Sequence, residues 1–245
     1  MAPRLPLTRL VLGSASLADD LAFVALADLH GVLAARPDTP SRLIRGIMAS
    51  LHAGRWGLGA ELYRQTRDAD LGIPTSVAKD PWVVQALEDA GYRRAAGKSV
   101  RANDRGHPNC HRVGGRTAPG RPIRSRHRHP RACLPIQSPR QREIGEHLTT
   151  TEVRGLAFAF NHPAVRLDLE MARLNGEALR ATVALPDEAS TVVLRAFAWH
   201  VRGSDTDAVD LWRSLEIAHA AAVGPDRFEK AEAPEAAEIA RRAFG

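Results

Sequence analysis

The spacing of apolar residues predicts amphipathic helices in the first hundred residues. Ala22, Leu26, Leu29 and Leu33 recur at helical spacing within 17–35, and Ser16 stands where a helix N-cap is expected. A short strand at 43–44 and a helix over 47–55 follow. A further helix is predicted over 79–91, because Asp80 can cap it, Pro81 suits its first position and Gly91 suits its end.

The second half of the chain opens with a different period. Over 164–171, apolar residues alternate with Arg166, Asp168 and Glu170, which predicts a half-buried strand. Asn175-Gly176 is typical of a tight hairpin turn, so a returning strand is expected over 179–185. Helices are then predicted from 186–188, from near Thr206 and over 228–244. Asp168 and Glu170 could form a metal pair, but a solvated strand face is the preferred interpretation.

The segment 62–74 carries the candidate chemistry. Arg64, Thr66, Asp68 and Asp70 alternate and would share one face if the segment is a strand. Two carboxylates at i and i+2 of a strand lie about 7 Å apart at their Cα atoms, so both could reach one divalent cation. The alternative is a turn with two solvated aspartates.

The order of these motifs resembles the polymerase-beta-type nucleotidyltransferase superfamily. A helix carrying Gly46, Met48, Leu51 and His52 precedes the acidic segment. The pattern LxxGxMxxLH…LYRxTxDADLG is similar to nucleotidyltransferase-like proteins of high-GC actinobacteria, relatives of abortive-infection-type toxins. The resemblance covers roughly 40–100 and 143–225.

The resemblance implies an α+β fold, with a mixed sheet flanked by helices and a helical C-terminal part. It implies transfer of NMP from NTP to a hydroxyl, with Asp68 and Asp70 as catalytic carboxylates that hold Mg²⁺. It implies that the nucleotide phosphates are bound by the remaining motif residues, namely Arg45, Gly46, Arg64 and Thr66. RNA and a neutralising antitoxin-like protein are the macromolecular partners it suggests.

Two features depart from the family pattern. Arg45-Gly46 stands where the family has Gly-Gly or Gly-Ser, so Arg45 could either supply a cationic group to phosphate or block the pocket. Arg202, Asp207 and Asp210 resemble a second family motif, although Arg195 and Ser204 replace its lysines. The alternative interpretation of this second motif is a helix cap together with an Arg–Asp pair.

One segment accounts for the net positive charge of the protein. The 245-residue chain has a net charge of +6, but residues 101–142 alone contain 11 arginines and one acidic residue, Asp104. The rest of the chain is therefore net negative. The segment also lacks apolar periodicity, which favours either disorder or a basic arm that binds phosphates.

A third interpretation is that this segment is translated out of frame. The overlapping codons of residues 127–135 permit a shifted reading of Ile-Asp-Ile-Leu-Val-Pro-Ala-Tyr. That peptide resembles a buried strand bearing the family's third acidic motif. We hypothesise a compensated frameshift that opens near 101–110 and closes near 139–143. The third catalytic carboxylate would then be missing, which places present activity in question.

Three domains and three functions follow from these observations. We expect a nucleotidyltransferase-like part at 1–100, a basic segment at 101–142 and a hairpin with helices at 143–245. The candidate functions are an active nucleotidyltransferase, a non-catalytic nucleotide-binding remnant, and a nucleic-acid-binding protein that uses the arginine-rich segment. With no apolar run of about 18 residues and only Cys110 and Cys133, a cytoplasmic location without membrane contact is expected.

Overall fold

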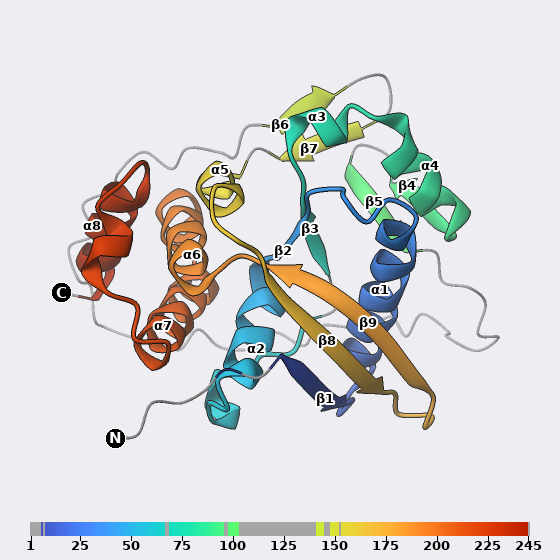
Figure 1. Ribbon diagram of the computed structural model, residues 1–245, viewed down its shortest axis with the longest axis horizontal. Helices are drawn as coiled ribbons and strands as arrows, with labels where there is room; N and C mark the ends of the chain where they lie inside the picture. Colours follow the sequence, from blue (N-terminus) through green and yellow to red (C-terminus); the bar gives the residue numbers. More distant parts are fainter. Residues whose placement is uncertain are drawn as a thin grey trace, which may run out of the picture.

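The computed structural model describes residues 6, 8–66, 69–95, 98–102, 141–144, 148–151 and 153–244. Its elements form an α+β fold, as predicted (Figure 1). The helices are α1 Leu17–Ala34, α2 Arg45–Arg55, α3 Thr75–Ala78, α4 Pro81–Asp89, α5 Leu156–Phe160, α6 Glu188–Arg202, α7 Asp205–Ala220 and α8 Ala233–Phe244, with 3-10 turns at Ala60–Leu62 and Pro225–Phe228. The strands are β1 Arg9–Gly13, β2 Arg42–Ile44, β3 Asp70–Gly72, β4 Tyr92–Ala95, β5 Lys98–Ala102, β6 Gln141–Ile144, β7 Leu148–Thr151, β8 Val165–Ala172 and β9 Ala178–Leu185.

The predicted caps and turn are confirmed. The Ser16 side chain accepts a hydrogen bond from the Asp19 amide at the start of α1. Asp80 accepts one from the Trp82 amide at the start of α4, which ends just before Gly91. Gly176 adopts φ 82° in the turn between β8 and β9, a conformation that costs glycine little.

The main sheet has the strand order β1-β8-β9, and strand β1 was not predicted. It runs parallel to β8, and β8 pairs with β9 in antiparallel register from Val165↔Leu185 to Ala172↔Ala178. Leu10 is buried while its neighbour Val11 is 76% exposed, so β1 does show period-two burial. Only three apolar residues in succession mark it in the sequence, which explains the omission.

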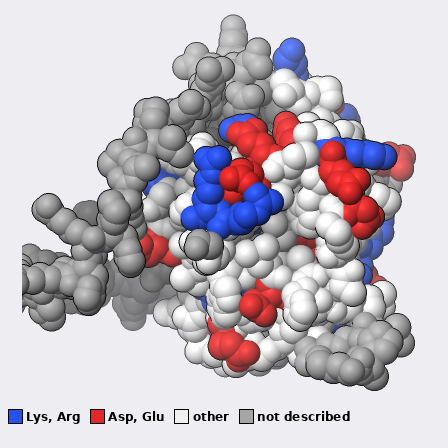
Figure 2. Space-filling model, turned by 90° about the vertical axis from the view of Figure 1, so that its left-hand side faces the viewer, with Lys and Arg blue, Asp and Glu red and all other residues white. Residues whose placement is uncertain are grey.

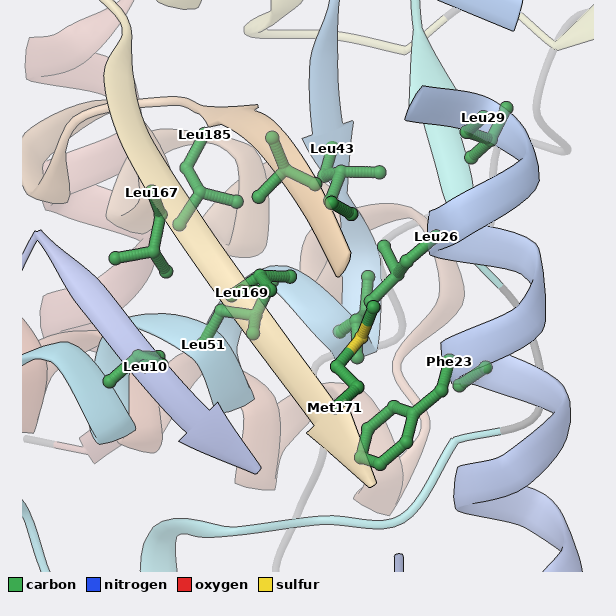
Figure 3. Close-up of a cluster of buried hydrophobic side chains, with 14 residues drawn as sticks. Leu10, Phe23, Leu26, Leu29, Leu43, Leu51, Leu167, Leu169, Met171 and Leu185 are labelled. Atoms are coloured by element: carbon green, nitrogen blue, oxygen red, sulfur yellow. The ribbon is translucent and has the colours of Figure 1, made fainter. Parts of the chain in front are cut away.

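One face of this sheet makes the principal core with α1 and α2 (Figure 3). The odd-numbered residues of β8 point into it, as the alternation predicted: Leu167, Leu169 and Met171 are all buried. Asp168 and Glu170 lie on the opposite face. Asp168 accepts a hydrogen bond from Thr182, and Glu170 pairs with Arg9 and Arg180, so the solvated-face interpretation is supported.

A second core lies between the C-terminal helices α6, α7 and α8. The C-terminal helix α8 starts at Ala233 instead of the predicted 228, because Pro225–Phe228 forms a 3-10 turn. Figure 2 shows basic and acidic side chains side by side on the face that carries α8. The ion pairs Arg154–Glu235 and Arg242–Glu238 belong to this region. No helix in the described part of the chain combines the length and apolar character needed to cross a membrane.

Two predicted strands differ from the structure. From the sequence, 92–100 is predicted to form one outgoing strand, but the structure pairs Tyr92–Ala95 with Lys98–Ala102 in antiparallel register. The strand considered for residues 64–70 is wrong for 64–66, which form neither helix nor strand; among the described residues of this segment, Asp70 pairs with β2. The basic segment and its out-of-frame interpretation concern residues that lie almost wholly outside the described ones.

Candidate functional site: a cluster of arginines and aspartates

The turn between β2 and α2 carries Arg45 and Gly46. Arg45 is the first residue of α2 and adopts φ 64°, which is unusual for a residue with a side chain. A Cβ on Gly46 would lie 3.5–3.6 Å from Thr66, so the chain passes close to the helix start at this point. No side chain among the described residues caps the helix at Ile44, and its first turn holds no acidic residue.

Asp70 lies opposite Ile44 in the β2–β3 ladder, and this register places it next to the turn. The Arg45 Nη1 atom lies 3.1 Å from the Asp70 Oδ1 atom. The predicted phosphate-binding turn and the predicted acidic motif are therefore in direct contact. The other carboxylate of that motif, Asp68, lies outside the described residues.

Arg64 and Thr66 reach the site from an irregular segment. Ser50 on α2 explains why Arg64 is not in a strand, because its Oγ donates to the Arg64 carbonyl at 3.1 Å and accepts from the Arg64 amide at 3.4 Å. These bonds take the place of ladder partners. The Arg64 side chain extends to α7, where its Nη1 donates to Asp210 Oδ2 at 2.9 Å.

The distal motif lies at the junction of α6 and α7. Arg202 donates two hydrogen bonds to Asp207, of which the one from Nε measures 2.9 Å. Ser204 caps α7 by accepting from the Asp207 amide at 3.1 Å. These contacts are the cap and the Arg–Asp pair that the sequence left as an alternative. The pKa of Arg202 is raised, chiefly by the hydrogen bond to Asp207 and also by the charges of Asp210 and Asp70, so the two motifs share one electrostatic environment.

Asp210 is the buried centre of the site. Its carboxylate accepts from Arg64 and from Arg213 Nη1, both at 2.9 Å, and lies 3.3 Å from Arg195 Nη1. Burial lowers the pKa of Arg195 to about 10, although Asp210 favours its charged form. Only 3% of Arg195 is exposed, and its Nε and Nη2 atoms find no hydrogen-bond partner among the described residues. The cluster therefore carries buried positive charge that its aspartates do not fully match.

The sequence did not indicate two members of this site. Arg195 was noted only as a replaced lysine, and Arg213 was not singled out. Arg213 is buried, donating to the Leu62 carbonyl at 2.6 Å and to Ser50 Oγ at 2.9 Å. The signal that could have found it is the spacing 210, 213, 214, 217, which places an Asp–Arg pair on the buried face of α7. We call the following residues the Arg–Asp cluster: Arg45, Arg64, Asp70, Arg195, Arg202, Asp207, Asp210 and Arg213.

A second polar network connects α2 with the start of α6. His52 is fully buried, its Nε2 lies 2.8 Å from the Pro186 carbonyl, and its Nδ1 lies 3.5 Å from Glu188 Oε1. Trp56 donates to the same carboxylate at 2.8 Å, and Arg55 pairs with it. Burial opposes ionisation of Glu188, but His52, Trp56 and Arg55 hold its pKa at about 2. From the sequence, a structural role is expected for His52, and these contacts support that expectation.

The described residues do not fit Mg²⁺ well. Magnesium is held through carboxylate oxygens, yet Asp70 is paired with Arg45, and Asp207 and Asp210 are buried against arginines. Among the described residues, no group of three His, Cys, Asp or Glu side chains could hold a metal ion.

Comparisons with protein-family models, with curated proteins and with solved structures gave no match for this chain.

Proposed function

We propose that the protein is nucleotidyltransferase-like, with an ancestral reaction that moved NMP from NTP to a hydroxyl with Mg²⁺. In this proposal the present chain binds the polyphosphate of a nucleotide without efficient transfer. The first part depends on the motif resemblance. The second follows from the third carboxylate that the out-of-frame interpretation removes, and from the poor fit of the described residues to Mg²⁺.

One observation carries the proposal: the ion pair between Arg64 and Asp210. It joins the segment before Asp70 to a motif 146 residues further along the chain. Two motifs that were singled out separately, for the same kind of chemistry, thus meet at one ion pair. Helix capping alone requires only neighbours in sequence, so it does not account for this long-range contact.

Each exposed arginine of the cluster has a role in this proposal. A guanidinium presents N–H groups in a planar fork that matches phosphate oxygens. Arg45, Arg64 and Arg202 are each partly exposed and each held by one aspartate. The buried Arg195 and Arg213 orient Asp210 and add positive potential below them.

The test is a pair of measurements on the full chain. ATP and GTP binding is measured by calorimetry, and transfer of labelled NMP to RNA or protein is measured separately. We expect binding without transfer above background. Arg64→Ala is expected to weaken binding at least tenfold, because one charge-assisted contact is lost. Asp210 keeps Arg213 and Arg195 in this variant, so the fold should survive.

Arg9→Ala is the matched control, because it also removes one arginine from an ion pair but lies on the outer face of the sheet. Failure of both nucleotides to bind would refute the proposal. Transfer that disappears in Asp70→Ala would instead identify an active enzyme.

A second candidate function rests on the charge of residues 101–142. Eleven arginines in one segment could bind RNA through its phosphates without help from the cluster. Deleting 103–140 is expected to abolish salt-sensitive RNA binding if this is the function. The double variant Arg64→Ala/Arg202→Ala should leave that binding unchanged. Loss of RNA binding in the double variant would assign the interaction to the cluster.

A further inference from the structure

Three arginines of the cluster share one arrangement. The side chains of Arg45, Arg64 and Arg202 are 47%, 41% and 41% exposed, and each is paired with one aspartate among the described residues. Asp207 and Asp210 lie beneath, at 6% and 3% exposure. A ligand from solvent would therefore meet guanidinium groups before it met these two carboxylates.

The balance of charge in the cluster favours an anion. Arg195 and Arg213 add two buried positive charges, so five arginines stand against three aspartates in the described part of the site. Two of the Arg195 nitrogens lack partners there. A divalent cation placed beside Asp70 would be repelled by these arginines, whereas an anion on the exposed guanidinium groups would complete the charge balance.

Arg45 occupies the position where a cation would be needed. Its guanidinium lies 3.1 Å from Asp70, the described carboxylate of the predicted metal pair. Its backbone is left-handed, at φ 64°, a conformation that is unfavourable with a side chain present. Strain of this kind accumulates at ligand-binding positions, where the surrounding structure maintains it.

We propose that the Arg–Asp cluster binds the polyphosphate of a nucleotide without a divalent cation, with the Arg45 guanidinium in place of the metal. This inference rests on the proposed function and narrows its ligand to the metal-free polyphosphate. Arg45 turns between Asp70 and a phosphate oxygen, and Arg64 and Arg202 bind further oxygens while their aspartates hold them in place. In this arrangement Asp70 can stay paired with Arg45, because the carboxylate is not needed as a metal ligand.

The experiment titrates inorganic triphosphate and ATP into the full chain by calorimetry, once in EDTA and once in millimolar Mg²⁺, at constant ionic strength. We expect both anions to bind in EDTA. Mg²⁺ should leave the affinity unchanged or lower it, because the metal competes with arginines for phosphate oxygens. Arg45→Gly should weaken binding in EDTA about tenfold, the effect of one charge-assisted hydrogen bond.

Arg36→Gly is the matched control, since it removes the same charge from an exposed ion pair with Asp80 outside the cluster. It should bind both anions as the unaltered chain does. Binding of ATP only in Mg²⁺ would overturn this inference and leave nucleotide binding in place. Binding by Arg45→Gly equal to that of the unaltered chain in EDTA would also overturn it. Absence of binding under both conditions would overturn the proposed function as well.

Discussion

Arg45 combines an unfavourable backbone conformation with a half-exposed ion pair to Asp70. Substitutions can separate the effects of these two features on stability. Arg45→Gly relieves the left-handed conformation and loses a pair worth about 0–1 kcal/mol. Arg45→Ala loses the pair and keeps the strain. We expect Arg45→Gly to be within about 0.5 kcal/mol of the unaltered chain in urea unfolding, and Arg45→Ala to be about 1 kcal/mol less stable than Arg45→Gly.

Ala222→Gly is the control for backbone strain alone, because Ala222 has φ 52° and lies away from the cluster. It should gain stability. Equal losses in Arg45→Gly and Arg45→Ala would mean that the conformation at this position carries no strain.

Asp210 compensates the buried charge of two arginines. Asp210→Asn removes that charge while nearly keeping the shape, which leaves Arg195 and Arg213 unbalanced in the interior. We expect a loss of about 3–5 kcal/mol in the free energy of unfolding, measured in urea. Asp80→Asn is the surface comparison: its pair with Arg36 is exposed, and asparagine caps a helix as well as aspartate does. A loss below 1 kcal/mol for Asp210→Asn would contradict this account.

At the scale of single residues, the sequence identified groups of the right chemistry but not their mutual positions. Asp70, Arg64, Arg202 and Asp210 were all singled out, and the structure brings them together. The Arg202–Asp207 pair is local, but the Arg64–Asp210 pair depends on how α7 packs on α2, which no local pattern encodes. Arg195 and Arg213 were not predicted as site residues, because a charged residue on a helix is ordinarily expected at the surface.

Glu188, at the start of α6, contacts His52 and Arg55 of α2, and these contacts favour its ionised form. The folded pKa of Glu188 is about 2, below its ordinary value of 4.5, so its contribution to stability is fully present above about pH 5. That contribution is lost as the pH falls towards 2. It amounts to about 3–4 kcal/mol, because one pKa unit corresponds to about 1.4 kcal/mol.

Glu188→Gln is therefore expected to lower stability at pH 7 and to flatten the decline between pH 5 and pH 2, as followed by urea unfolding at a series of pH values. Glu170→Gln, which changes a carboxylate on the exposed sheet face, should retain the decline of the unaltered chain. An identical slope in the two variants would exclude Glu188 as the titrating group.

Elements with a strong period or a clear cap were predictable, and elements fixed by tertiary contacts were not. Helix α4 has both a capping aspartate and Pro81, and β8 alternates over its whole length. The segment 63–66 also alternates, yet Ser50 takes the backbone groups of Arg64 that a strand would use. Strand β1 is short and depends on β8 for its partner, so its own five residues carry little signal.

Across the whole molecule, the organisation of charge separates one segment from the rest. Residues 101–142 supply all of the net positive charge, whereas many arginines of the described parts on either side are paired with carboxylates. A genuine basic arm and an out-of-frame segment predict different coding sequences. We expect codons 100–143, read in the shifted frame, to spell Ile-Asp-Ile-Leu-Val-Pro-Ala-Tyr or a close variant. Stop codons or a polar amino-acid sequence in that frame would contradict the frameshift hypothesis and favour the basic arm.

The same hypothesis predicts what correction of the frame would do. A chain with the shifted segment restored would regain a buried strand and a third carboxylate close to Asp70. Phosphoryl and nucleotidyl transfer depends mainly on positioning and on charge stabilisation, so the added carboxylate should convert a binding site into a catalytic one. Because the Arg45 guanidinium occupies the metal position beside Asp70, we expect Mg²⁺-dependent transfer of labelled NMP only in the corrected chain that also carries Arg45→Gly, at least a hundredfold above that of the present chain. Adding Asp70→Ala to that chain should abolish the transfer. If the corrected Arg45→Gly chain folds and binds ATP but transfers nothing, the missing third carboxylate is not what prevents transfer.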